Sequence, residues 1–294
     1  MPADPTRSRV TIALLVVPGL AVIAFSLIVP LGLSVYYSFT DSAGFGEFQN
    51  VGFDNYKTIL TDDPEFWRSL RNVMLLIVAT IFIQNPIAFV LAAVLSRLSA
   101  RLSQILRTIY FVPAVLSLVI VAKLWVDVFN PTFGILNKLL RAVGLDAIAM
   151  SWLSDPRTAL PAVIWIILWQ GFGWAVFFFY AGLMTVPRDL EEAARVDGAS
   201  WFQVYVRVII PYLFPVLSTV VVIDVISSMK QMELIYLTTA GAPGQLTQFL
   251  SVYLYQKAFV AGEYGYGNAL SVLFVVISVG FTLVVQRVMR ARLR

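Results

Sequence analysis

Residues 158–187, TALPAVIWIILWQGFGWAVFFFYAGLMTVP, contain no charged side chain between Arg157 and Arg188. A helix needs about 20 largely apolar residues to cross the hydrocarbon core of a bilayer. The stretch is long enough, so it predicts a transmembrane helix over about residues 158–185.

Similar stretches occur along the chain. Residues 10–40, 72–96 and 264–286 carry no charge, whereas residues 105–129 contain Lys123 and Asp127, and residues 208–229 contain Asp224. The sequence therefore predicts an all-α polytopic bundle, formed as one transmembrane domain over residues 1–294. Its six spans are expected at about residues 10–38, 72–96, 105–129, 158–185, 208–229 and 264–286.

Two apolar segments need separate treatment. Leu234–Gln256 is uncharged, but its TTAGAPGQLTQ segment would leave backbone groups unsatisfied in lipid, so we expect an extramembrane loop. The first apolar run follows Arg7 and Arg9 like a secretory signal. It is longer than the 7 to 15 residues that are typical of a signal core, so we predict an uncleaved first span.

The composition excludes several kinds of chemistry. The chain of 294 residues has 59% apolar and 13% charged residues, with neither Cys nor His. Disulfides, thiolate nucleophiles and the usual zinc ligands are therefore absent, and we expect no metal site and no catalytic residue. The net charge of +4 suits basic loops on the cytoplasmic side of a membrane better than nucleic-acid binding, because no basic run alternates with aromatics.

The basic residues also predict an orientation. With six spans both termini lie on one side, and placing them in the cytoplasm puts twelve Lys and Arg residues inside and seven outside. Lys123 and Lys230 lie within or beside spans. We therefore expect a multi-pass membrane protein with cytoplasmic N- and C-termini, and the family resemblance described below implies that the membrane is the bacterial inner membrane.

The predicted cytoplasmic loop at residues 187–207 has strong helix signals. Asp189 and Glu191 suit a first helical turn, Gly198 suits a left-handed stop, and Ser200 with Gln203 forms a capping box. These features fit a helix that docks on a soluble partner and, equally well, a capped hairpin on the bilayer surface.

The same loop resembles the EAA loop of binding-protein-dependent ABC import permeases. Glu192, Ala193, Ala194, Gly198 and Pro211 match that pattern, with Val208 and Ile210 as mild departures. VGFDNYKTIL and MELIYLTTAGAPGQLTQFLSVYLYQKAF look like segments of the carbohydrate, maltose-type permeases in their six-span form. The resemblance implies that the coupling residues toward an ATPase are Glu192, Ala193, Ala194, Asp197 and Gly198.

The resemblance also implies partners. The chain has no phosphate-binding loop of its own, so a separate pair of ATP-binding cassette ATPases would hold ATP and Mg²⁺, and this chain needs no cofactor. A second, similar permease subunit and an extracytoplasmic substrate-binding protein would complete an importer, and the transported carbohydrate would be a sugar, an oligosaccharide or a glycerol phosphate. The alternatives are a stand-alone secondary transporter of a small polar solute, for which we find no internal repeat, and an export permease.

Polar side chains on two spans suggest where the substrate binds. Asp224, Ser227, Ser228 and Gln231 form one helical stripe, and Gln170 and Trp174 share a face of the preceding span. Hydrogen-bonding groups and a flat aromatic ring suit a sugar, but such a stripe also suits contacts between subunits. The family resemblance favours a substrate site of Gln170, Gly171, Trp174, Asp224, Ser227, Ser228 and Gln231, in which Asp224 leaves open a neutral, amino or phosphorylated sugar.

Other residues in the spans leave alternatives open. Lys123 and Asp127 lie four residues apart and can form a structural ion pair, although ionisable groups within a membrane are also candidates for function. Gly171 and Gly173 could permit a close helix contact or open the helix at a cavity.

Overall fold

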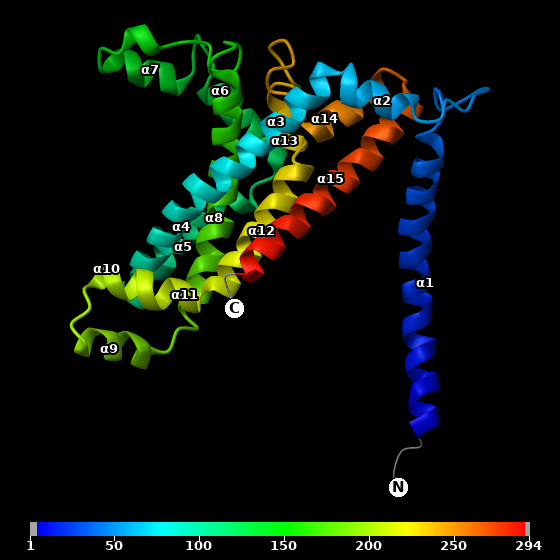
Figure 1. Cartoon of the computed structure of the whole chain (residues 1–294). Coiled ribbons are helices and arrows are strands. Elements are labelled where there is room, and N and C mark those ends of the chain that lie inside the picture. The colour runs from blue at the N-terminus through cyan, green and yellow to red at the C-terminus, as the bar shows by residue number, and fades with distance from the viewer. Residues whose placement is uncertain (1–4, 292–294) are drawn as a thin grey trace. The chain divides into compact units, whose positions relative to one another are not determined.

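The computed structural model describes residues 5–291, with side chains from Leu14 to Met289. The described chain is helical apart from turns, loops and one isolated β-bridge between Thr40 and Asn50, which confirms the predicted all-α class (Figure 1). It forms two compact units. Unit 1 comprises the chain up to residue 63 together with 254–276, and unit 2 comprises 64–253 together with the chain from 277 onward.

The second apolar stretch forms one long helix in unit 2. It consists of α3 (Pro64–Ala79), the π-helical turn η1 (Thr80–Gln84) and α4 (Asn85–Leu95). Pro86 explains the π turn, because proline has no backbone N–H and its ring would collide with the carbonyl group of Phe82. The wider turn accommodates the ring, and the helix continues without a break.

Two other predicted spans are bent. α5 (Ala100–Val115) and α6 (Leu118–Val128) meet at 95°, where Leu116 and Ser117 have extended backbone conformations. α10 (Trp201–Val204), the π turn η3 (Tyr205–Ile209) and α11 (Ile210–Tyr212) meet α12 (Phe214–Lys230) at 70°. Pro211 and Pro215 flank this second bend at Leu213.

The central helix of unit 2 is α8 (Ala159–Leu183), which packs against α4 and α5. Gly173 permits the contact with α5, since an added Cβ would collide with the backbone of Tyr110 and Phe111. A buried apolar cluster joins α4, α8, η3 and the start of α12 through residues such as Phe179, Tyr205 and Leu213. For Gly173, the close-contact alternative is therefore the correct one.

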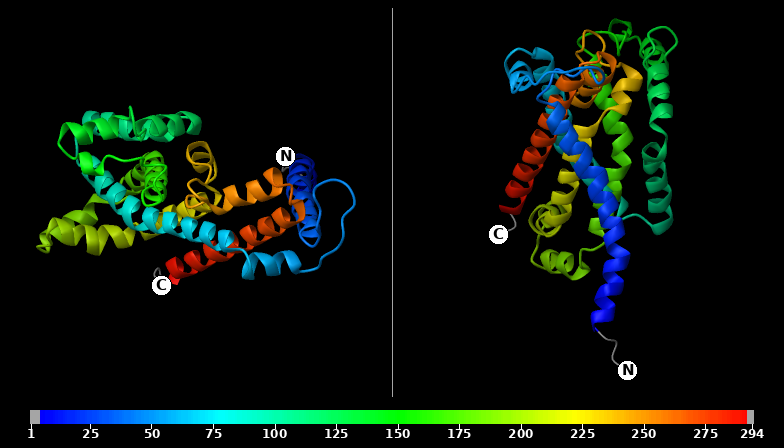
Figure 2. Two further views of the ribbon diagram at one scale, coloured as in Figure 1. Left: turned by 90° about the horizontal axis from the view of Figure 1, so that it is seen from above. Right: turned by 90° about the vertical axis from the view of Figure 1, so that its right-hand side faces the viewer.

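The two ends of unit 2 carry short helices (Figures 1 and 2). α9 (Arg188–Val196) lies at one end with α10 and α11, whereas α7 (Ile135–Ala142) and the turn η2 (Asp146–Ile148) belong to the opposite end. The segment expected as a loop contains the short helices α13 (Glu233–Thr238) and α14 (Leu250–Tyr255), separated by the Gly- and Pro-containing turn. Asn72 donates hydrogen bonds to the carbonyl groups of Leu246 and Gln248, at 2.8 Å each, and so fixes this turn to α3.

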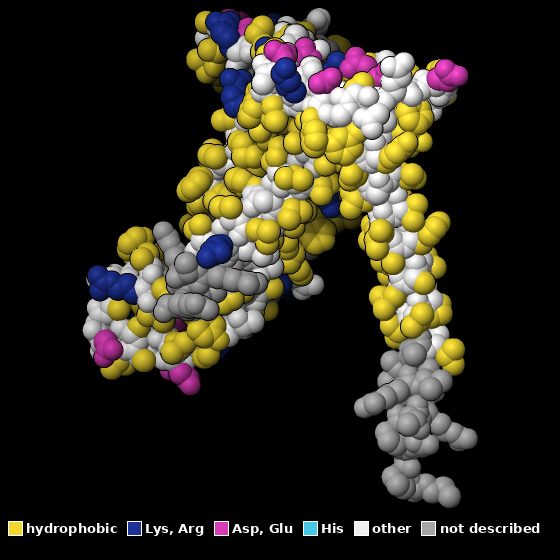
Figure 3. Space-filling view, turned by 45° about the vertical axis from the view of Figure 1, so that its right-hand side comes forward, with side chains coloured by type: hydrophobic (Ala, Val, Ile, Leu, Met, Phe, Trp, Pro, Cys, Tyr) yellow, Lys and Arg dark blue, Asp and Glu magenta, His cyan; other side chains and the backbone are white. Residues whose placement is uncertain are grey.

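Unit 1 contains α1 (Pro5–Tyr37), α2 (Asp54–Thr61), η4 (Gln256–Val260) and the first part of α15 (Tyr264–Ala291). The Asn55 amide donates to the carbonyl groups of Ser38 and Thr40, both at 2.9 Å, so it joins α2 to the end of α1. The described side chains of α1 are exposed from Leu14 to Leu33, and they give this helix an apolar surface along its length (Figure 3).

Four helices of the described chain have the length and apolar composition of membrane spans. They cover Leu14–Tyr37, Pro64–Leu95, Ala159–Leu183 and Tyr264–Met289, and there are up to six spans if each bent pair is counted as one. Crossing of the membrane by all six stays a prediction. The side chains of the terminal arginines that contribute to the predicted orientation lie outside the described residues: Arg7, Arg9, Arg290, Arg292 and Arg294.

Candidate functional site

A cavity of about 350 Å³ lies between three helices of unit 2. The wall contributed by α12 carries the four predicted polar residues of that span, and the wall contributed by α8 carries the three predicted residues of the other. All seven candidate substrate residues therefore line one cavity: Gln170, Gly171, Trp174, Asp224, Ser227, Ser228 and Gln231.

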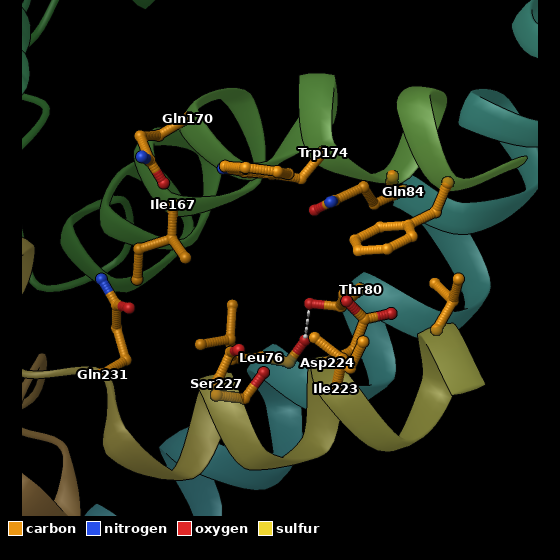
Figure 4. A pocket seen from close by; sticks show the side chains of 15 residues that line it. Leu76, Thr80, Gln84, Ile167, Gln170, Trp174, Ile223, Asp224, Ser227 and Gln231 are labelled. Carbon is orange, nitrogen blue, oxygen red and sulfur yellow. Dashed lines mark hydrogen bonds between the residues drawn. The ribbon is translucent and has the colours of Figure 1, made fainter. Parts of the chain in front are cut away.

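Helical spacing explains why these side chains converge. Residues three or four positions apart lie on one face of a helix, and the stripe from Asp224 to Ser228 faces α8 across the cavity (Figure 4). α12 ends at Lys230, and Gln231 follows in an extended conformation, where it still lines the cavity. Lys230 is exposed and is not among the lining residues.

A third wall comes from α3 and η1, and the sequence analysis did not identify it. Leu76, Thr80 and Gln84 lie one turn apart along this helix and face the cavity. Gln84 and Asn85 are adjacent polar residues in an otherwise apolar stretch just before Pro86, which was the signal available. The π turn lies within this wall. Because it is wider than an α-helical turn, it changes the direction in which the following side chains point, and so helps to place Thr80 and Gln84 at the cavity.

Asp224 is held by a neighbouring amide. Asn85 Nδ2 donates a hydrogen bond to Asp224 Oδ2 at 2.7 Å, so α4 is linked to α12 beside the cavity. A charge-assisted hydrogen bond of this kind stabilises a carboxylate away from water. Asp224 is the one charged side chain among the lining residues, and neither Lys nor Arg accompanies it there. The cavity therefore offers carboxylate, amide and hydroxyl groups.

Trp174 supplies a flat apolar surface to this cavity. Its ring centroid lies 5.0 Å from that of Phe111 and 6.3 Å from that of Phe178. These contacts fix the indole while leaving the side chain 45% exposed. Figure 4 shows Trp174, Gln170 and Gln84 on one side of the cavity, with Asp224 and Ser227 on the other.

Gly171 differs from Gly173. It lines the cavity, and a Cβ added there would meet Gln84 Nε2 at 3.5 Å, which is an ordinary contact. Of the two predicted alternatives, Gly171 therefore fits the one in which a glycine opens space at a cavity.

The predicted coupling residues lie together on α9 and the turn that follows it. Glu192, Ala193, Asp197 and Gly198 are exposed, whereas Ala194 packs against the buried cluster. Gly198 has a φ of +82°, as a left-handed stop requires. The capping box is also present, because the Ser200 and Gln203 side chains each bond the other residue's backbone N–H.

The charged pair in the third predicted span is formed. Lys123 Nζ lies 2.8 Å from Asp127 Oδ1 on α6, with both side chains substantially exposed. Neither residue lines the cavity between α3, α8 and α12. The geometry thus agrees with a structural pair.

Comparisons with known proteins identify the class to which this fold and cavity belong. Residues 84–293 match the family described as binding-protein-dependent transport system inner membrane component. A probable ABC transporter permease protein of Pyrococcus horikoshii is 34% identical over 91% of both chains. A multiple sugar-binding transport system permease protein of Streptococcus mutans is 31% identical over 90% of both chains.

A solved structure gives the same result for the fold. A chain of a bacterial alginate ABC transporter, crystallised with an alginate pentasaccharide-bound periplasmic protein, superposes with a TM-score of 0.82 over 99% of both chains at 22% identity. The chain described here belongs to the family of inner membrane components of binding-protein-dependent transport systems, which are permease subunits of ABC transporters.

Proposed function

We propose that this permease subunit carries a carbohydrate across the inner membrane and that the cavity between α3, α8 and α12 is part of its substrate site. The observation that carries the proposal is the meeting of a half-exposed Trp174 with seven polar side chains around one cavity. Sugars have hydroxyl groups at their edges and an apolar ring face. An aromatic ring can pack against that apolar face, while the surrounding polar side chains hydrogen-bond the hydroxyl groups.

The lining also favours one range of substrates. Phosphate and carboxylate groups are usually bound by Arg or Lys, and neither residue type lines this cavity in the described chain. Asp224 instead accepts hydrogen bonds, so hydroxyl and amino groups suit it. Neutral and amino sugars are therefore better candidates than glycerol phosphate, and the names of relatives such as the multiple-sugar permease support a sugar.

The remaining subunits would supply the energy and the delivery of substrate. In the proposed assembly, an ATPase pair holds ATP and Mg²⁺ and docks on α9 through the exposed residues Glu192, Ala193, Asp197 and Gly198. Ala194, the fifth predicted coupling residue, faces the rest of unit 2 and holds the helix in place instead. This chain then performs no catalysis; its helices alternate between inward- and outward-facing arrangements. A second permease subunit would complete the membrane domain, and an extracytoplasmic binding protein would deliver the sugar. The bare apolar surface of α1 is suited to lipid or to that second subunit.

A competing role for the polar stripe is adhesion between the two permease subunits. The test uses Trp174→Ala and Gln231→Ala in the assembled complex, with matched controls at Trp165, which lies on α8 outside this cavity, and at the exposed Gln104. Uptake of labelled neutral sugars and ATPase activity stimulated by the loaded binding protein are measured separately.

A substrate site predicts weaker uptake in the two cavity variants, with the complex intact and its ATPase still stimulated. Loss of assembly in both variants would favour the adhesive role. Unchanged uptake in both would refute the site.

A further inference from the structure

Arg97 connects three parts of unit 2 at the end that carries α9. It lies in the turn between α4 and α5. Its Nη2 atom lies 2.7 Å from Glu191 Oε2 on α9, and its Nε atom donates to the hydroxyl group of Tyr205 at 3.2 Å. The guanidinium carbon also lies 5.4 Å from the centre of the Tyr205 ring. The arginine thus contacts α9 and η3 at the same time.

The partners of Arg97 are themselves fixed. Tyr205 is 4% exposed and belongs to the buried cluster between α4, α8 and η3, and its ring stacks against Trp201 at 4.4 Å. Partial burial opposes the charge of Arg97, but the hydrogen bonds with Tyr205 and Glu191 outweigh it and raise the pKa of Arg97. The guanidinium is therefore charged at physiological pH.

The contact with Arg97 turns one face of α9 toward the rest of unit 2. Glu191 and Ala194 are three residues apart, so they share the face that is turned toward the rest of unit 2. Glu192 and Val196, four residues apart, lie on another face and are exposed, Val196 by 87%. Apart from the ion pair, the described contacts that restrict rotation of α9 about its axis are apolar: Ala194 on the helix, and Val186 and Ala199 on either side of it, pack against the buried cluster.

We propose that Arg97 is a positioning residue, which holds α9 through Glu191 so that the Glu192 face points outward toward the ATPase. This inference rests on the proposed docking role of α9 but adds a residue outside the EAA loop. The α4–α5 turn thus fixes the rotation of the short helix, and movement of α9 is transmitted to α4. The Asn85 side chain of α4 donates a hydrogen bond to Asp224, which lines the substrate cavity.

The test measures the position of α9 directly. The chain has no native Cys, so spin labels can be placed at Arg188→Cys on α9 and Val94→Cys on α4, both exposed. The distance distribution between the labels is recorded in the assembled complex for Arg97→Ala, Glu191→Ala and the exchange Arg97→Glu/Glu191→Arg. Arg101→Ala is the matched control, because Arg101 is exposed and forms no ion pair among the described residues.

We expect a broader distribution in both single variants, recovery in the exchanged variant and no change in the control. Sugar uptake per ATP hydrolysed should fall about two- to fivefold in the single variants, which corresponds to the loss of one partly exposed ion pair, and should recover in the exchange. An unchanged distribution in the single variants overturns the proposal. If the single variants do not accumulate in the membrane, the exchanged variant decides: recovery of its level and distribution supports the proposal, and failure refutes it. Loss of ATPase co-purification with an unchanged distribution would overturn the positioning role of Arg97 and leave the proposed docking role of α9 standing.

Discussion

Gly171 and Gly173 stand two residues apart on α8 and have different surroundings. An added methyl group at 173 collides with the backbone of α5, which cannot yield, whereas at 171 it meets only the end of the Gln84 side chain. The same substitution therefore separates packing from cavity shape.

We expect Gly173→Ala to lower the free energy of unfolding by about 1–3 kcal/mol, the usual cost of overpacking. Gly171→Ala should leave stability nearly unchanged and reduce sugar uptake, because it narrows the cavity. Thermal unfolding of the purified complex and uptake in vesicles measure the two effects. Equal loss of stability in both variants would contradict the assignment.

The Asn85–Asp224 hydrogen bond gives a second prediction at this scale. Asn85→Leu would remove the amide that stabilises the Asp224 carboxylate, and breaking a hydrogen bond to a charged group costs about 1.5–3 kcal/mol. We expect Asp224→Asn in the Asn85→Leu background to restore part of that stability, since it removes the charge that has lost its partner. No improvement of the double variant over Asn85→Leu would show that the bond contributes little.

Single residues of the cavity were predictable to different degrees. Asp224, Ser227, Ser228 and Gln231 repeat with helical spacing in an apolar stretch, so their common face follows from sequence alone. Thr80 and Gln84 also lie four residues apart, but two polar residues are a weaker pattern than the four of α12. Their position in the cavity depends on a π turn and on how α3 packs against α8 and α12. Long-range packing of that kind leaves no periodic signal in one chain.

Among the elements, α9 gives the clearest prediction. Glu192 and Gly198 are exposed, and no neighbouring atom lies within 4 Å of a Cβ built at Gly198. Glu192→Lys and Gly198→Asp should therefore leave the protein in the membrane while preventing transport, the first by reversing charge on the docking face. The second places a side chain at φ +82°, at a cost of about 1–2 kcal/mol.

Co-purification of the ATPase and sugar uptake measure this effect. Gly198→Asn is the control, because Asn and Asp both tolerate the left-handed backbone better than other side chains and only Asp adds a negative charge, so Gly198→Asn should retain more activity than Gly198→Asp. Normal uptake in Glu192→Lys and Gly198→Asp would exclude a docking role for this helix.

Helices were easier to predict than their bends. Uncharged stretches of sufficient length identify the apolar segments, and α9 is marked by acidic residues in its first turn and by Gly198 after its end. The break at Leu213 lies between Pro211 and Pro215, which a membrane helix can also tolerate without breaking. The break at Leu116–Ser117 has no proline at it, because Pro113 lies within α5. The sequence therefore predicts spans at about residues 105–129 and 208–229 without locating the bends that the structure shows there.

At the scale of the whole molecule, the predicted orientation can be tested within unit 2. α9 and the α7–η2 region belong to opposite ends of that unit, so they should lie on opposite sides of the membrane. We expect Ser200→Cys to be protected from an impermeant thiol reagent added outside intact cells, and Ala147→Cys to react with it. Both positions are exposed and the chain has no other Cys. If Ser200→Cys reacts and Ala147→Cys does not, the topology is the inverse of the predicted one.

The hydrogen bond between Asn85 and Asp224 has a consequence for the order in which the helices assemble in the membrane. A carboxylate near the centre of a membrane helix costs about 2.5–3.5 kcal/mol during insertion, so insertion of α12 alone carries that penalty. Translation proceeds from the N-terminus, and Asn85 leaves the ribosome 139 residues ahead of Asp224. The helix that bears the amide is thus already synthesised when the acidic helix emerges, and assembly of the bundle can follow the direction of synthesis.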